Sequence, residues 1–106
     1  MSEMNCNDKV MHLLESLGPC FQGLGDPTRR QIVSLLIDKD SLNVTQIAEH
    51  IPMSRPTVSH HLKILKQSGL LQVQKKGTEM YYCLEFNETI NLLKELVSLV
   101  EDECKN

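Results

Sequence analysis

Residues 44–71 constrain the fold more than any other part of the chain. Apolar residues recur at helical spacing on both sides of Pro52. Pro52 cannot continue a helix, whereas the hydroxyl of Ser54 can accept a hydrogen bond from a free amide in the first turn of a new one. The stretch therefore predicts two short helices joined by a tight turn, over about residues 44–69.

The second of these predicted helices has an apolar face and a polar face that lacks acids. Its inward positions are Val58, Leu62 and Leu65, and no Asp or Glu occurs over residues 54–67. The polar face carries Arg55, Thr57, Ser59, His60, Lys63 and Lys66. An ordinary amphipathic helix pair explains the apolar positions but not the missing acids. We therefore predict a helix-turn-helix whose second helix enters the major groove of DNA.

The charge distribution supports this prediction although the whole chain is acidic. The net charge is −3, but residues 54–79 hold five basic residues and one acidic residue. Residues 80–106 hold two basic residues and six acidic ones. Because phosphate contacts are local and are screened over about 8–10 Å, the distribution matters more than the total.

A change of period after the helix pair predicts a β-hairpin over residues 71–84. Gly77 supplies its turn, and Lys75 and Lys76 lie at the tip. Lysines are common at any solvated hairpin tip. Directly after a helix-turn-helix, however, a basic hairpin is typical of the wing of a winged helix, which contacts the phosphates beside the groove.

The first and last segments are predicted to be helices, over about residues 8–24 and 87–104. Gly18 and Pro19 are expected to interrupt the first of them. The last has an apolar stripe that is wide for a terminal helix, which predicts pairing with the first helix of a second copy. Such a homodimer would present two recognition helices about 34 Å apart, matching a palindromic site.

Another helix is expected to begin at Asp26 and Pro27, as N-cap and first helical residue. Arg29 and Arg30 near its start oppose the helix dipole and need another partner. Surface ion pairs are favoured over a nearby phosphate. The residues that follow this helix, 38–43, are expected to form a polar connection.

Length and composition indicate a single domain, 1–106, of ordinary globular character. No signal peptide or membrane-spanning run is evident, so a cytoplasmic location is expected, with all four cysteines as thiols. No CxxC motif, glycine-rich phosphate loop or His-Glu metal motif occurs, and an enzyme is not expected.

Three segments carry a family resemblance: GDPTRRQIVSLL over residues 25–36, SRPTVSHHLKILKQSGLL over 54–71 and KKGTEMYYCL over 75–84. Together they resemble the ArsR/SmtB family, dimeric winged-helix repressors of bacteria. The resemblance implies groove-facing positions, phosphate contacts and a dimer interface formed by the first and last helices. The DNA-binding residues it implies, with the N-cap, are Ser54, Arg55, Thr57, Ser59, His60, Lys63, Lys75 and Lys76.

The chain departs from the usual sensor sites of that family. Asn43 and Thr45 stand where a Cys-x-Cys pair would bind soft metals, and Ser34 where persulfide sensors hold a cysteine. Residues 86–106 contain no histidine for a zinc site. Cys6, Cys20 and Cys104 are left as candidates for a thiol or thiophilic-metalloid sensor, with Cys20 and Cys104 expected to approach each other across the dimer. The alternative is that buried cysteines are small hydrophobes, and Cys83, in a predicted strand, is expected to lie in the core.

The sequence thus predicts a mainly α winged helix-turn-helix with a small β-hairpin, dimerising through its first and last helices. Its expected function is that of an autoregulatory repressor bound to double-stranded operator DNA. No particular cofactor is predicted, the inducer is unidentified, and a thiophilic metal or metalloid is left open. The alternative is a winged-helix adaptor that binds proteins and not DNA.

Overall fold

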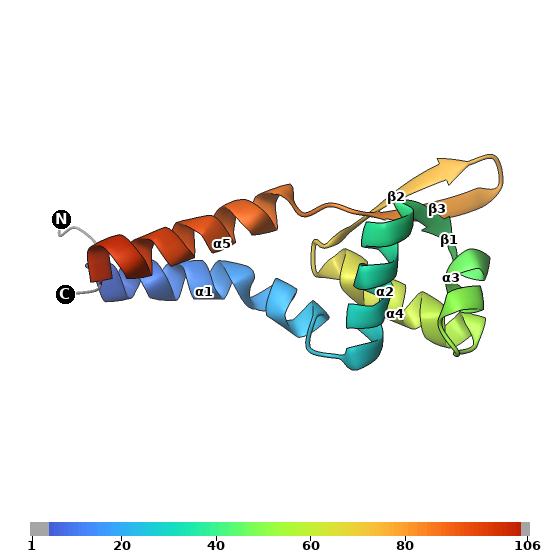
Figure 1. Cartoon of the computed structure of the whole chain (residues 1–106), viewed down its shortest axis with the longest axis horizontal. Helices are drawn as coiled ribbons and strands as arrows, with labels where there is room; N and C mark the ends of the chain where they lie inside the picture. The colour runs from blue at the N-terminus through green and yellow to red at the C-terminus, as the bar shows by residue number, and fades with distance from the viewer. Residues whose placement is uncertain (1–4, 105–106) are drawn as a thin grey trace. The chain divides into compact units, whose positions relative to one another are not determined.

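The computed structural model describes residues 5–104, which form two compact units (Figure 1). The winged unit is Pro19–Phe86, and the helical unit is the chain up to Gly18 together with the chain from Asn87 onward. The elements are α1 (Cys6–Gly23), α2 (Pro27–Lys39), β1 (Ser41–Asn43), α3 (Val44–His50), α4 (Arg55–Gln67), β2 (Leu71–Lys76), β3 (Glu79–Leu84), α5 (Asn87–Leu99) and a π-helical turn η1 (Val100–Cys104). None of the helices described over residues 5–104 has the length and apolar character needed to cross a bilayer.

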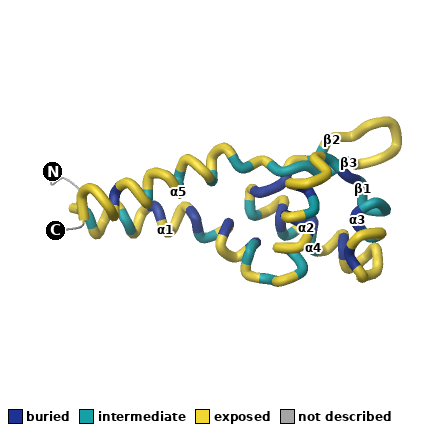
Figure 2. Tube along the Cα trace, viewed as in Figure 1, coloured by how far each residue is buried: buried dark blue, intermediate teal, exposed yellow. Residues whose placement is uncertain are grey.

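The core of the winged unit is made by the apolar faces that the periodicity predicted (Figure 2). Val58, Leu62 and Leu65 of α4 are fully buried, as is Ile47 of α3. Burial of an aliphatic side chain of this size contributes about 1.5–3 kcal/mol. The helix-turn-helix predicted over residues 44–69 is therefore confirmed as α3 and α4.

A three-stranded antiparallel sheet in the order β1-β3-β2 lies beside these helices. The predicted hairpin is confirmed as β2 and β3, with Val73 opposite Tyr82. The third strand, β1, was not predicted: part of the expected polar connection pairs with β3, and Leu42 lies opposite Tyr82. Leu42 is buried in the core, which explains why this short segment is held as a strand.

Side-chain caps and positive-φ glycines fix the ends of the recognition elements. Asn43 caps α3 in a capping box, in which its Oδ1 accepts from the Gln46 amide and the Gln46 side chain accepts from the Asn43 amide. Ser54 caps α4, as predicted. After α4 the chain turns through Gly69 at φ 78°, and the hairpin turns through Gly77 at φ 64°.

The helical unit contains the first turns of α1 and all of α5 and η1, which lie side by side (Figure 1). Leu13 and Leu17 of α1 and Leu99 of α5 are buried. The expected interruption of the first helix is wrong, because α1 continues through Pro19 to Gly23. Pro19 removes one backbone donor, but Cys20 in the following turn packs into the core and favours the helical continuation.

Candidate nucleic-acid interface

The polar face of α4 is open to solvent over its whole length. Every residue that the sequence analysis assigned to DNA on this element is exposed: Ser54, Arg55, Thr57, Ser59, His60 and Lys63. The opposite face of the same helix fills the core, so α4 cannot rotate without exposing Leu62 and Leu65. Packing therefore fixes which side chains α4 presents to a partner.

Two hydroxyls at the start of α4 form a local network. Ser54 Oγ accepts from the Thr57 amide at 3.4 Å and donates to Thr57 Oγ1 at 2.9 Å. The hydroxyl proton of Thr57 then points to no acceptor within this pair and can be donated to a ligand. Ser54 thus acts first as an N-cap, and Thr57 is the better placed of the two to contact an anionic partner.

His60 and His61 are adjacent on α4 but have different surroundings. Their ring centroids are 6.0 Å apart and the rings are tilted by 53°. His60 is exposed on the acid-free face, whereas the side chain of His61 is only 13% exposed. Of the two, only His60 is free to contact a partner of α4 through an exposed side chain.

His61 belongs to a polar cluster with Asp26 and Arg29. Its Nδ1 lies 3.3 Å from Arg29 Nη1 and 3.9 Å from Asp26 Oδ2. Asp26 caps α2 by accepting from the Arg29 amide at 3.1 Å. This backbone hydrogen bond, helped by the charges of Arg29 and His61, lowers the pKa of Asp26 below its ordinary value.

Arg29 and Arg30 bind backbone carbonyls, and not the surface ion-pair partners or the phosphate considered from the sequence. Arg29 donates to the carbonyls of Gln22 and Gly23, and Arg30 donates to the carbonyl of Leu24. These carbonyls lie at and just after the end of α1, where unpaired acceptors and the negative end of the helix dipole attract cations. Neither a surface ion pair nor a phosphate is needed to explain the two arginines.

The tip of the β2–β3 hairpin is exposed (Figure 2), and its sequence is basic. Lys75 and Lys76 both lie on its exposed part, directly before the turn. Lys76 Nζ sits 5.2 Å from the centroid of the Tyr81 ring, a cation–π contact that limits its motion. Tyr82, on the other face of β3, packs against the core and anchors the hairpin.

The cysteines are arranged differently from the sequence expectation. Cys6 and Cys104 form a disulfide within the helical unit, so these two are not the free thiols expected. Cys20 does not join them: it lies in the core of the winged unit, where burial raises the pKa of its thiol. Cys83, expected in the core, is half-exposed and donates to the carbonyl of Gln72. Among residues 5–104 no group of three His, Cys, Asp or Glu side chains could hold a metal ion.

Sequence reasoning missed two structural supports of the interface. Asn43 and Gln46 form the capping box of α3, and the Asn-x-x-Gln spacing could have revealed it. The contact of Arg29 with His61, which links α2 to α4, joins residues 32 positions apart and leaves no signal in the sequence.

An exposed second helix, a preceding helix that buttresses it and a basic hairpin define a winged helix-turn-helix, the fold of a large class of DNA-binding regulators. The sequence model described as "Bacterial regulatory protein, arsR family" matches residues 26–73, which include α2, α3 and α4. The chain is also 36% identical over 93 residues to an uncharacterised HTH-type transcriptional regulator of Methanocaldococcus jannaschii, covering 87% of this chain and 99% of the relative.

Two further similarities point the same way. The transcriptional repressor SdpR of Bacillus subtilis is 38% identical over 81 residues, which cover 74% of this chain and 89% of SdpR. A homodimeric winged helix-turn-helix DNA-binding domain from Mycobacterium bovis, solved by NMR, superimposes with a TM-score of 0.68 at 30% identity, covering 100% of this chain and 94% of that domain. The chain belongs to the ArsR family of DNA-binding transcriptional regulators, and the resemblance stated from the sequence is confirmed.

Proposed function

We propose that this protein is a cytoplasmic, homodimeric repressor that binds a palindromic operator, including one beside its own gene. In each protomer α4 enters the major groove, and the tip of the β2–β3 hairpin reaches the phosphates that flank it. The observation that carries the proposal is the exposed face of α4, which presents hydroxyl, imidazole and basic groups and holds no acid over residues 54–67.

The exposed side chains divide into two kinds of contact. Arg55, Thr57, Ser59 and His60 stand on the first two turns of α4, the part of a recognition helix that reads base edges. Lys63, one turn further along, joins the hairpin lysines on backbone phosphates. The guanidinium of Arg55 is the group best suited to bidentate recognition of a guanine.

The helical unit supplies the surface for dimerisation. Apolar side chains are exposed on α1 and on α5 with η1: Met11, Leu14, Ile90, Leu93, Val97 and Val100. An apolar surface of this kind marks an interaction site rather than an ordinary monomer surface. The similar domain from Mycobacterium bovis is a homodimer, and a two-fold pair of α4 helices would match the two halves of a palindrome.

The test is operator binding by fluorescence anisotropy, with duplex DNA taken from beside the gene. Arg55→Ala should weaken binding by about 1–3 kcal/mol and relax base preference at one position. Lys63→Ala should weaken binding to all sequences alike and reduce the slope of affinity against salt by about one.

Lys39→Ala is the matched control, since Lys39 is an exposed cation in the last turn of α2 and belongs to neither α4 nor the hairpin. It should leave both affinity and salt slope unchanged. If Arg55→Ala and Lys63→Ala behave like this control, the groove assignment is wrong. If the unaltered protein binds no duplex, the protein adaptor is the better interpretation.

A further inference from the structure

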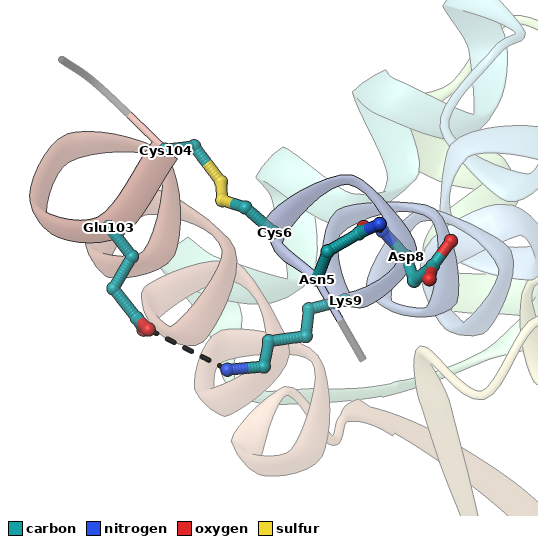
Figure 3. The surroundings of a disulfide bond; sticks show 6 residues. All are labelled: Asn5, Cys6, Asp8, Lys9, Glu103 and Cys104. Atoms are coloured by element: carbon teal, nitrogen blue, oxygen red, sulfur yellow. Dashed lines mark hydrogen bonds and ion pairs between the residues drawn. A yellow bond between two sulfur atoms is a disulfide. The ribbon is translucent and has the colours of Figure 1, made fainter. Parts of the chain in front are cut away.

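A disulfide bond joins the first residue of α1 to the last residue of η1 (Figure 3). The Cα atoms of Cys6 and Cys104 lie 5.6 Å apart, a usual separation for bonded cysteines. The two residues are 98 positions apart in sequence, so the bond closes almost the whole chain into a ring. It lies wholly within the helical unit, which also carries the exposed apolar residues of α1 and α5.

The ion pair that joins α1 to η1 at this end of the unit is weak by comparison. Lys9 Nζ lies 3.6 Å from Glu103 Oε1, and about half of each side chain is exposed (Figure 3). Exposed ion pairs of this kind contribute little and are screened by salt. All five residues of η1 are exposed, and π-helical turns are rare conformations. The disulfide is therefore the main tie between η1 and the start of α1.

The two sulfur atoms are accessible to different degrees and have different surroundings. Cys104 is exposed, whereas Cys6 is half-buried. Cys6 lies in the first turn of α1, whereas Cys104 follows Glu101, Asp102 and Glu103 at the end of η1. Because Cys104 is the more exposed of the two cysteines, an incoming thiolate reaches it more easily.

We propose that Cys6 and Cys104 form a reversible thiol–disulfide switch on the helical unit. The thiolate of a small thiol such as glutathione attacks Cys104 Sγ, the bond between the two cysteine sulfurs breaks, and Cys6 leaves as a thiolate. A second small thiolate attacks the sulfur of the first and releases Cys104 as a thiolate. Two electrons and two protons thus pass to the protein while two small thiols become one small disulfide, and the reverse steps close the bond again.

Opening the bond frees η1 and the first turn of α1. In a reducing compartment an accessible disulfide is more often a regulatory bond than a structural one. Because the helical unit carries the dimerisation surface, loosening this unit weakens the dimer. A weaker dimer has a lower affinity for a palindromic operator, a consequence that rests on the proposed function. The oxidised protein is then the tighter DNA binder.

The first part of the test follows the bond itself in the full chain. The protein is equilibrated in glutathione buffers of graded reduced-to-oxidised ratio, free thiols are trapped by alkylation, and the sites are located by mass spectrometry. Cys6 and Cys104 should interconvert together across these buffers, with the buried Cys20 unlabelled. A pair that stays oxidised at every ratio would show a structural disulfide and overturn the proposal.

The second part measures amide hydrogen exchange in the two states. Reduction should speed exchange in η1 and in the first turn of α1 by about tenfold or more and leave α4 unchanged. Cys6→Ser and Cys104→Ser should show the reduced pattern in either buffer, while Cys83→Ser is the matched control and should keep the redox response. Equal exchange in η1 in both states would overturn the proposal.

Operator affinity measured in the same buffers connects the switch to DNA. Reduction should weaken binding by about tenfold in the unaltered protein and not at all in Cys6→Ser. Equal affinity in both states would overturn the coupling of the switch to the operator. Binding to DNA in neither state would instead overturn the proposed function, and the thiol and exchange readouts would still decide the switch.

Discussion

Arg29 Nε lies 2.8 Å from the carbonyl oxygen of Gly23, the last residue of α1. The same guanidinium donates to Gln22 and lies against His61 of α4. The Arg29 side chain therefore donates hydrogen bonds to carbonyls at the end of α1 and also contacts α4. The orientation of α4 depends on this linkage as well as on the apolar core.

Arg29→Ala should lower the free energy of unfolding by about 2–3 kcal/mol, because it removes a part-buried charge-assisted hydrogen bond to the Gly23 carbonyl and an exposed one to the Gln22 carbonyl. Arg30→Ala is the matched control, since Arg30 makes one exposed hydrogen bond to Leu24. Its loss should cost less than about 1 kcal/mol. Urea denaturation measures both. Equal effects of the two substitutions would contradict the linkage described for Arg29.

Asp26 should give the stability a dependence on acid pH. Its folded-state pKa lies below the ordinary value of 3.8, chiefly because its carboxylate accepts from the Arg29 amide. The stabilisation is therefore complete above pH 3.8 and is lost as the pH falls through the lower, folded-state pKa.

Asp26→Asn isolates this ionisation, because asparagine is also a good N-cap but does not titrate. The unaltered protein should melt at a higher temperature than Asp26→Asn at neutral pH, and the gap should close in acid. Thermal unfolding followed by circular dichroism across this pH range measures the gap. Parallel curves for the two proteins would rule out the capping carboxylate as the cause.

The core of the winged unit should depend strongly on α4. Leu62 is fully buried, so Leu62→Ala should lower the free energy of unfolding by about 2–5 kcal/mol. Ile37 of α2 is 63% exposed, and Ile37→Ala should change it by less than about 0.5 kcal/mol. Chemical denaturation distinguishes the two, and a large loss at Ile37 would show that it is covered in solution.

Gly69 should not tolerate alanine. It has φ 78° after α4, and alanine there should cost about 1–2 kcal/mol. The melting temperature of Gly69→Ala tests this, and a stabilising effect would contradict the turn geometry.

The sequence predicted those parts of the fold that repeat or carry local signals. The spacing of Val58, Leu62 and Leu65 placed α4 and its buried face, and Ser54 marked its start. Strand β1 has only three residues, too few to show a period, and its pairing with β3 is a long-range contact. Pro19 disfavours a continuous helix locally, but α1 continues through it because Cys20 packs into the core.

In the candidate site, too, local features were predictable and long-range contacts were not. Exposure of Arg55 and the hairpin lysines follows from the period of their elements. The pairing of Cys6 with Cys104 could not be predicted, because no local spacing links residues 98 positions apart. In the sequence Cys20 was as good a sensor candidate as Cys6 and Cys104. Its burial in the core distinguishes it from them.

Mapping the DNA contact residue by residue tests the central claim most directly. Amide NMR spectra of the full chain would be followed during titration with duplex DNA at low salt, where sequence-independent binding uses the same phosphate-contacting face. We predict that the shifts concentrate on the amides of Arg55, Ser59 and Lys63 and on the hairpin tip around Lys76. Shifts concentrated on α2 or on η1, with α4 unperturbed, would contradict the assignment of α4 as the recognition helix.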